Sequence, residues 1–279
     1  MKTIRTTLFL TALTLLFLAL GQAFGGQRGM TFALVFAVLM NGTAYFFSDK
    51  IALASSGAVP ISREEAPRLY EVMERLAAKA NLPVPKLYMI PQPAPNAFAT
   101  GRNPSHASVA VTQGLLELMN DDELEGVIAH ELSHVRNYDI LTSSIAATLA
   151  GAITWIARMG FWFGGGGSDR ERGGGLSALL MLILAPLAAL LLQLGISRQR
   201  EYQADASGAR MVGYPNGLIS ALEKLGAYNK RIPMDVPPST SALMIVAPLS
   251  AGQIFSSLFS THPPLADRIA ALRSMTVSR

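Results

Sequence analysis

The 279-residue chain contains no cysteine, so any metal it binds cannot be held by thiolates, and the absence fits a reducing compartment. Charged residues are scarce, at 15%, and the net charge of +4 comes without a basic run interleaved with aromatics. That pattern argues against nucleic-acid binding. The glycine-rich residues 164–175 are not followed by Lys-Ser/Thr, so they form a flexible connector rather than a phosphate-binding loop.

Hydrophobic residues make up half of the chain, and the mean hydropathy is positive, which is typical of a membrane protein with soluble parts. Four apolar stretches reach roughly the 20 residues that a bilayer-spanning helix needs. They are residues 6–23, 30–47, 140–157 and 176–196. The first also fits a signal peptide, with Lys2 and Arg5 at its start and a cleavage site near Ala23, but a second long span follows almost at once.

The sequence His-Glu-Leu-Ser-His begins at His130 and contains two of the four histidines of the chain. On a helix, His130 and His134 share one face and can bind one zinc ion. Glu131 can then accept a proton from the attacking water. A capping pattern at Asn120 and Glu123, followed by helical apolar spacing, predicts that helix. The alternative is a chance pattern on a buried helix, which would leave two histidines in need of partners.

A catalytic zinc site needs a third protein ligand and an open position. Glu201 and Asp205 lie four residues apart and so share a helix face. Glu201 is the predicted third ligand, and Asp205 is predicted to accept the outer N–H of a ligating histidine. Without the histidine pair, the ordinary explanation would be a solvated helix in which Arg198 and Arg200 pair with these acids.

The predicted ligands lie on one side of the membrane, because the histidines precede the third apolar stretch and Glu201 follows the fourth. Lys2 and Arg5 assign that side to the cytoplasm by the positive-inside rule, although Arg170 and Arg172 in the opposite connector weaken the assignment. We therefore expect two transmembrane hairpins and a catalytic domain in two parts. The hairpins are residues 1–50 and 140–196, and the two parts of the catalytic domain are residues 51–139 and 197–279.

The soluble residues before the zinc helix should contain a helix starting near Ala66 and three short strands. The strands are predicted at residues 86–90, 96–100 and 108–112, with a turn joining the last two. The free edge of that hairpin can bind an extended substrate through main-chain hydrogen bonds. The predicted fold class is a mainly α membrane protein with a small β-hairpin or sheet and four transmembrane helices.

The chain resembles the HtpX family of bacterial membrane zinc metalloproteases over essentially its whole length. The resemblance rests on four segments in the family's order, which are residues 96–101, 130–134, 201–205 and 261–268. The family is similar to the CAAX prenyl proteases, which have more membrane spans. The resemblance implies a gluzincin-like zinc metalloprotease domain with one Zn²⁺ per chain. It also implies cytoplasmic cleavage of misfolded or damaged membrane proteins and a role in envelope stress.

The resemblance places further residues near the site. His262 and Arg268 are the candidates for stabilising the negative charge that develops during hydrolysis, His262 as a catalytic residue and Arg268 as a substrate-binding one. Both also fit a simple helix start, with Arg268 on the solvent face. Asn96 and Ala97 are predicted to orient the substrate backbone, unless Asn96 is an ordinary turn residue. Asp139 is expected to mark the membrane surface rather than to brace the zinc helix.

The sequence therefore predicts a membrane-embedded zinc endopeptidase of the inner membrane. Its partners would be the lipid bilayer and unfolded or misassembled membrane proteins. The alternative is a catalytically inactive scaffold or chaperone with a structural zinc site. Structural zinc sites are closed by four protein ligands, usually rich in cysteine, and would leave Glu131 without a role. A transporter is the weakest of the three, because the apolar stretches carry almost no ionisable residues.

Overall fold

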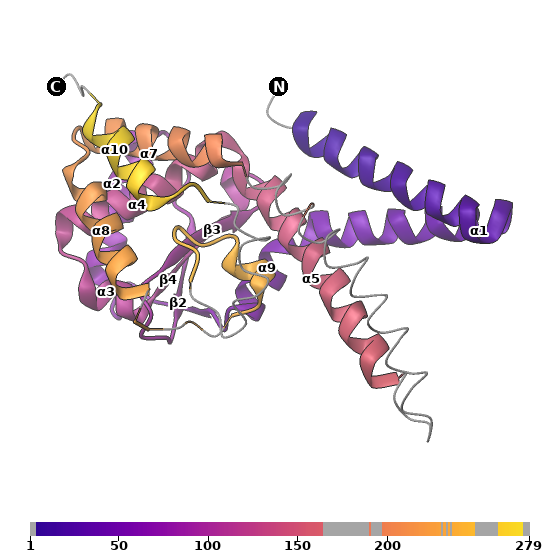
Figure 1. Cartoon of the computed structure of the whole chain (residues 1–279). Coiled ribbons are helices and arrows are strands. Elements are labelled where there is room, and N and C mark those ends of the chain that lie inside the picture. Colours follow the sequence, from indigo (N-terminus) through magenta and orange to yellow (C-terminus); the bar gives the residue numbers. More distant parts are fainter. Residues whose placement is uncertain are drawn as a thin grey trace.

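The computed structural model describes residues 4–163, 190, 197–229, 231–232, 234, 236–248 and 262–275. A small sheet and the helices around it form one body, and two helical elements project from it (Figure 1). These are α1 (Ile4–Ser55) and α5 (Asp139–Phe163).

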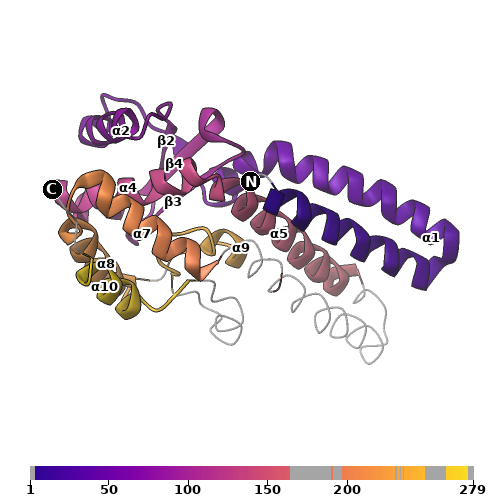
Figure 2. The same ribbon diagram turned by 90° about the horizontal axis from the view of Figure 1, so that it is seen from above.

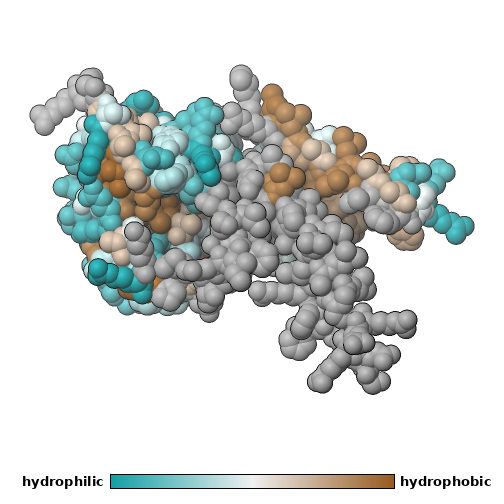
Figure 3. All heavy atoms as spheres, in the orientation of Figure 1, coloured by the Kyte–Doolittle hydropathy of each residue, from teal (hydrophilic) through white to brown (hydrophobic). Residues whose placement is uncertain are grey.

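Helix α1 is a hairpin, because the chain reverses at Gly26, where φ is 55° and ψ is −145°. Glycine adopts this backbone conformation without the clash that a Cβ would cause. The two arms are joined where Asn41 Nδ2 donates to Thr14 Oγ1 at 2.9 Å. Apolar surface covers much of this hairpin in Figure 3, as expected of a segment whose surroundings are lipid.

The sheet has four strands in the order β1-β2-β4-β3. They are β1 (Val59–Pro60), β2 (Lys86–Ile90), β3 (Ala97–Gly101) and β4 (Ala107–Thr112). The predicted antiparallel hairpin is confirmed as β3 and β4, which are linked through a 3₁₀ turn, η1 (Pro104–His106). Strand β2 pairs in parallel with β4, so β3 lies at the edge of the sheet.

The remaining helices cover the sheet and build the core. They are α2 (Pro67–Lys79), α3 (Gln113–Leu118), α4 (Asp121–Asn137), α7 (Arg198–Val212), α8 (Asn216–Asn229), α9 (Pro238–Ser241) and α10 (Leu265–Arg273). Helix α4 is central, because it contacts α2, α7, α8 and β3. Its apolar face, with Leu124, Ile128 and Leu132, is fully buried in the main core. The predicted start of α2 is confirmed, with Ala66 as its N-cap.

The expectation of four membrane spans is confirmed only in part. Within the described residues, two helices are long and apolar enough to cross a membrane, Thr6–Ala23 and Gly25–Ser55. The third predicted stretch forms α5, whose apolar portion Asp139–Thr154 is shorter than a full span. The fourth stretch lies outside the described residues except for Leu190, and so does the connector 164–175.

Candidate metal centre

Helix α4 positions the two predicted histidine ligands. Its start is fixed by a capping box, in which Asn120 Oδ1 accepts from the Glu123 N–H and Glu123 Oε2 accepts from the Asn120 N–H, both at 2.9 Å. One helical turn then separates His130 from His134, and their Nε2 atoms are 3.2 Å apart. The His130 ring is buried and the His134 ring is half-buried. The predicted helix and the shared face are therefore confirmed.

Helix α7 brings Glu201 to the two histidines. Glu201 Oε2 lies 3.7 Å from His130 Nε2, and Glu201 Oε1 lies 3.5 Å from His134 Nε2. One potential ligand atom from each of the three residues lies within 4.8 Å of the other two. Two imidazole nitrogens and one carboxylate oxygen are the ligands of many catalytic zinc sites, which keep a fourth position open. The donor set thus fits the zinc ion that the sequence predicts.

Asp205 holds the outer nitrogen of His130, as predicted. Its Oδ1 atom lies 2.8 Å from His130 Nδ1, which leaves Nε2 directed at the cluster. Arg268 donates two hydrogen bonds to the same carboxylate, from Nε to Oδ2 at 2.8 Å and from Nη2 to Oδ1 at 2.7 Å. Burial raises the pKa of Asp205, but the charge and hydrogen bonds of Arg268 outweigh it and lower the pKa overall. Asp205 is therefore a carboxylate.

Asp139 holds the other histidine, contrary to the expectation that it only marks the membrane surface. Its Oδ2 atom lies 3.3 Å from His134 Nδ1, and its Oδ1 atom lies 3.7 Å from Arg200 Nη1. The contact is possible because Tyr138 ends α4 in the left-handed conformation, at φ 62°, and turns the chain back. Each histidine thus has a carboxylate behind it, which fixes its tautomer and raises its basicity.

Glu131 is buried beside the cluster and is not among the three converging ligands. Burial raises the pKa of its carboxyl to about 7. Burial lowers the pKa of His134, but the carboxylates of Asp139, Glu201 and Glu131 outweigh it and raise that pKa to about 9. A carboxyl group with a pKa near neutrality can both accept and return a proton at physiological pH.

His262 reaches the centre from the segment before α10. Its Nδ1 atom lies 3.2 Å from Glu201 Oε2, and its Nε2 atom lies 3.1 Å from the Ala242 carbonyl oxygen. Glu131, His134, Glu201 and His262 line one small cavity with residues of β3, α5 and the segment after α9. The predicted position of His262 near the metal site therefore agrees with the structure.

Arg268 does not lie on the solvent face, and nothing of it is exposed for contact with a substrate. Its side chain is 0% exposed, and its third hydrogen bond runs from Nη1 to the Ile245 carbonyl oxygen at 2.7 Å. It pairs with Asp205 and also lies close to Glu201, with Arg268 Nη1 3.6 Å from Glu201 Oε2. The side-chain length of arginine and its forked guanidinium explain why this residue can bridge a carboxylate and a carbonyl group.

Asn96 and Ala97 contact the chain's own segment after α9, so the edge of β3 is only partly free. Asn96 Nδ2 donates to the Val246 carbonyl oxygen at 2.8 Å. The Ile245 N–H donates to the Ala97 carbonyl oxygen at 2.9 Å. Asn96 is fully buried and is no ordinary turn residue. Ala99, further along the same edge, lines the cavity at the cluster.

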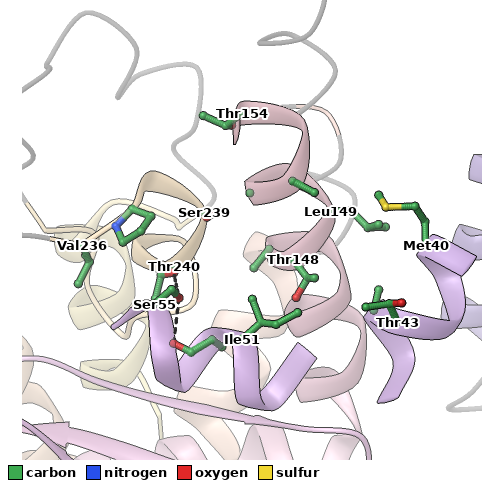
Figure 4. A pocket seen from close by; sticks show the side chains of 16 residues that line it. Met40, Thr43, Ile51, Ser55, Thr148, Leu149, Thr154, Val236, Ser239 and Thr240 are labelled. Carbon is green, nitrogen blue, oxygen red and sulfur yellow. Dashed lines mark hydrogen bonds between the residues drawn. The ribbon is translucent and has the colours of Figure 1, made fainter. Parts of the chain in front are cut away.

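The short helix α9 connects this segment to the apolar helices. Thr240 Oγ1 and Ser55 Oγ are 2.8 Å apart, which joins α9 to the end of α1 (Figure 4). A larger and mainly apolar cavity, of about 620 Å³, lies between α1, α5 and α9. Neither α9 nor its contact with α1 was predicted, because the sequence of residues 233–238 reads as an irregular proline-rich loop.

Comparison with known proteins agrees with this centre. The model of "Peptidase family M48" matches residues 63–276. A relative described as "Protease HtpX homolog" from Desulfatibacillum aliphaticivorans is 56% identical, over 96% of this chain and 88% of the relative. Another with that description, from Thermodesulfovibrio yellowstonii, is 52% identical over 99% of both chains. The crystal structure of S. mikatae Ste24p has a similar fold, with a TM-score of 0.53 at 21% identity; the match covers 97% of this chain and 64% of that one.

Proposed function

Because the chain belongs to peptidase family M48 and is a metalloendopeptidase, we propose that it cleaves misfolded or damaged membrane proteins on the cytoplasmic side of the inner membrane. His130, His134 and Glu201 would hold one zinc ion. Two observations support a membrane substrate: the apolar hairpin α1 is part of the same chain, and α5 runs directly from the metal centre into apolar sequence. Lys2 and Arg5, before the first apolar stretch, support the cytoplasmic side.

The reaction can be derived from the side chains around the cluster. A zinc ion held by these residues would supply Lewis acidity, lowering the pKa of water and polarising a peptide carbonyl. Glu131, buried beside the three ligands, takes the proton of the attacking water and passes it to the departing amine. In this proposal, His262 keeps Nε2 on the Ala242 carbonyl oxygen and uses Nδ1–H, which faces Glu201 Oε2 in the structure, to donate a hydrogen bond to the peptide carbonyl oxygen as negative charge develops there.

The edge of β3 orients the substrate in this proposal. An extended peptide that pairs with an edge strand is held by its main chain, so recognition depends little on side chains. Ala99 is the residue of β3 that lines the cavity, and it would place the scissile bond beside Glu131. Such recognition suits a protease that must accept many different unfolded segments.

The inactive scaffold is the competing function, and the position of Glu131 argues against it. A structural zinc site would be completed by a fourth protein ligand. Here Glu131 and His262 line a small cavity together with two of the three proposed ligands, His134 and Glu201. The buried carboxyl of Glu131 beside a His/His/Glu cluster is the single observation that carries the proteolytic function.

The test is the substitution Glu131→Gln, with proteolysis of an unfolded casein and zinc content measured on the same preparations. We expect zinc to be retained and cleavage to fall by about 10²- to 10⁴-fold, because the proton acceptor is lost while the ligands remain. Glu117→Gln, an exposed glutamate on α3, is the matched control and should change neither quantity. Equal cleavage by wild type and Glu131→Gln, or cleavage that persists after chelation, would refute the mechanism.

A further inference from the structure

A second site lies where the soluble body meets the apolar helices. A cavity of about 480 Å³ is bounded by the first turns of α1, its second arm near Tyr45, the turn between β3 and β4, and the start of α5. Figure 2 shows the N-terminal end of α1 beside the start of α5. Thr6 Oγ1 and Thr142 Oγ1 join these two helices at 2.8 Å. The cavity is therefore built between elements that are fixed to one another.

Arg102 supplies the single charge among the described residues that line this cavity. Its side chain is half-buried, and within the described part of the chain it has no hydrogen bond or ion pair. The acid closest to the cavity in sequence, Asp139, directs its two oxygens to His134 and Arg200 instead. A cation withdrawn from water without a partner is costly, so this site is complementary to an anion.

The neighbouring groups define what kind of anion fits. Tyr45 and Ser105 are exposed lining residues whose hydroxyl groups can donate hydrogen bonds. The planar guanidinium of arginine matches the oxygens of a phosphate with two parallel hydrogen bonds. A phosphate group fits these donors.

Part of the lining of the cavity is apolar, which favours a lipid over free phosphate. Leu10 and Leu141 line it, and each belongs to an apolar helix that continues away from the soluble body. Tyrosine and arginine are the residues that proteins place at the level of lipid headgroups. We propose that this cavity binds an anionic phospholipid, with Arg102 on the phosphate and an acyl chain against Leu10 and Leu141.

The site is independent of proteolysis and can be tested by binding alone. Native mass spectrometry of the full chain in detergent would be titrated with phosphatidylglycerol. We expect Arg102→Gln to weaken the tightest binding about tenfold, as loss of a charge-assisted pair does, and Arg102→Lys to retain most of it. Arg210→Gln, an exposed arginine on α7, is the control and should bind like wild type. Equal binding by wild type and Arg102→Gln would overturn the proposal, as would full displacement of the lipid by excess inorganic phosphate.

A second experiment changes the charge at the cavity by labelling the folded protein and then measures lipid binding. Since the chain has no cysteine, Ser105→Cys creates one thiol at the cavity. Coupling a negatively charged thiosulfonate reagent there should reduce phosphatidylglycerol binding several-fold, because it places an anion beside Arg102. A positively charged reagent of the same size should not reduce it. Equal loss with both reagents would indicate simple blockage and contradict the charge complementarity that we propose.

Discussion

Arg268 supports the His/His/Glu cluster without belonging to it. Its guanidinium holds Asp205, and Asp205 in turn holds the outer nitrogen of His130. Carboxylates behind ligating histidines typically change metal affinity by about 10- to 100-fold. The position of a C-terminal helix, α10, is thereby coupled to the geometry of residues on α4.

Replacing Arg268 with methionine should damage both stability and metal binding. The change leaves the buried Asp205 carboxylate without the positive charge of Arg268, and among the described residues only His130 remains as its partner, which costs about 3–5 kcal/mol. We expect a lower melting temperature and zinc affinity reduced by about 10- to 100-fold, measured by competition with a chelator. Arg273→Met on the same helix is the control, because that side chain is 64% exposed and pairs with exposed Glu223. If both variants bind zinc equally well, Arg268 does not position Asp205.

The site residues that were predictable from the sequence are those linked by helical spacing. His130 with His134, and Glu201 with Asp205, lie four apart, and periodicity alone puts each pair on one face. The role of Asp139 depends on a left-handed residue at Tyr138, which no local pattern indicated. Arg268 was placed on a solvent face because its partner lies 63 residues away in sequence. Contacts of that kind depend on tertiary packing.

At the scale of elements, α4 and α8 pack closely because Gly126 has no side chain. A Cβ at this position would lie 2.5 Å from the backbone nitrogen of Leu218, so the helices would have to move apart. We expect Gly126→Ala to lower stability by about 1–3 kcal/mol, seen as a lower melting temperature. Gly42→Ala in α1, where nothing lies within 4 Å, should cause no loss. Equal melting temperatures for the two variants would show that the contact is not tight.

The start of α4 is also joined to α8 by charge. Glu123 accepts hydrogen bonds from Lys224 Nζ at 2.7 Å and from Ser220 Oγ at 2.6 Å. Burial raises the pKa of Glu123, but these donors and the Asn120 N–H outweigh it and lower the pKa below its usual range.

A lowered pKa in the folded state makes this contribution acid-sensitive. The contribution of ionised Glu123 to the free energy of unfolding is fully present above the unfolded-state pKa of about 4.3. It is lost as the pH falls through the lower folded-state pKa. We expect Glu123→Gln to lower the melting temperature at pH 7. The difference in melting temperature between the variant and wild type should become smaller as the solution becomes more acidic. Glu223→Gln, an exposed glutamate on α8, should show no such pH dependence. A constant difference between wild type and Glu123→Gln at every pH would contradict the linkage.

Local elements were predictable where a pattern is short and continuous. The capping box, the three main strands and the hairpin between β3 and β4 follow from turn residues and apolar spacing. The parallel pairing of β2 with β4 was not predicted, since it joins strands between which another strand intervenes in sequence. The hydrogen bond between Ile245 and Ala97 at the edge of β3 was also not predicted, because the two residues are far apart in the sequence.

For the whole molecule, the proposed topology places the turn of α1 and the metal centre on opposite sides of the membrane. The absence of cysteine makes this directly testable with single thiols. Gln27→Cys, at the exposed turn of α1, should react with a membrane-impermeant maleimide applied to the periplasmic face. Glu117→Cys on α3 should react only after the membrane is permeabilised. The reverse pattern would place the metal centre outside the cytoplasm and overturn the proposed localisation.

Because Arg268 lies near the end of the chain, the contacts that link it through Asp205 to His130 can form only late in synthesis. A ribosome produces the apolar hairpin first, the histidines later and Arg268 63 residues after Asp205. While the chain grows, the membrane segments can insert before the carboxylate that holds His130 has its partner. Until α10 has docked, Asp205 lacks the guanidinium that pairs with it, so the side chain behind His130 is not yet fixed.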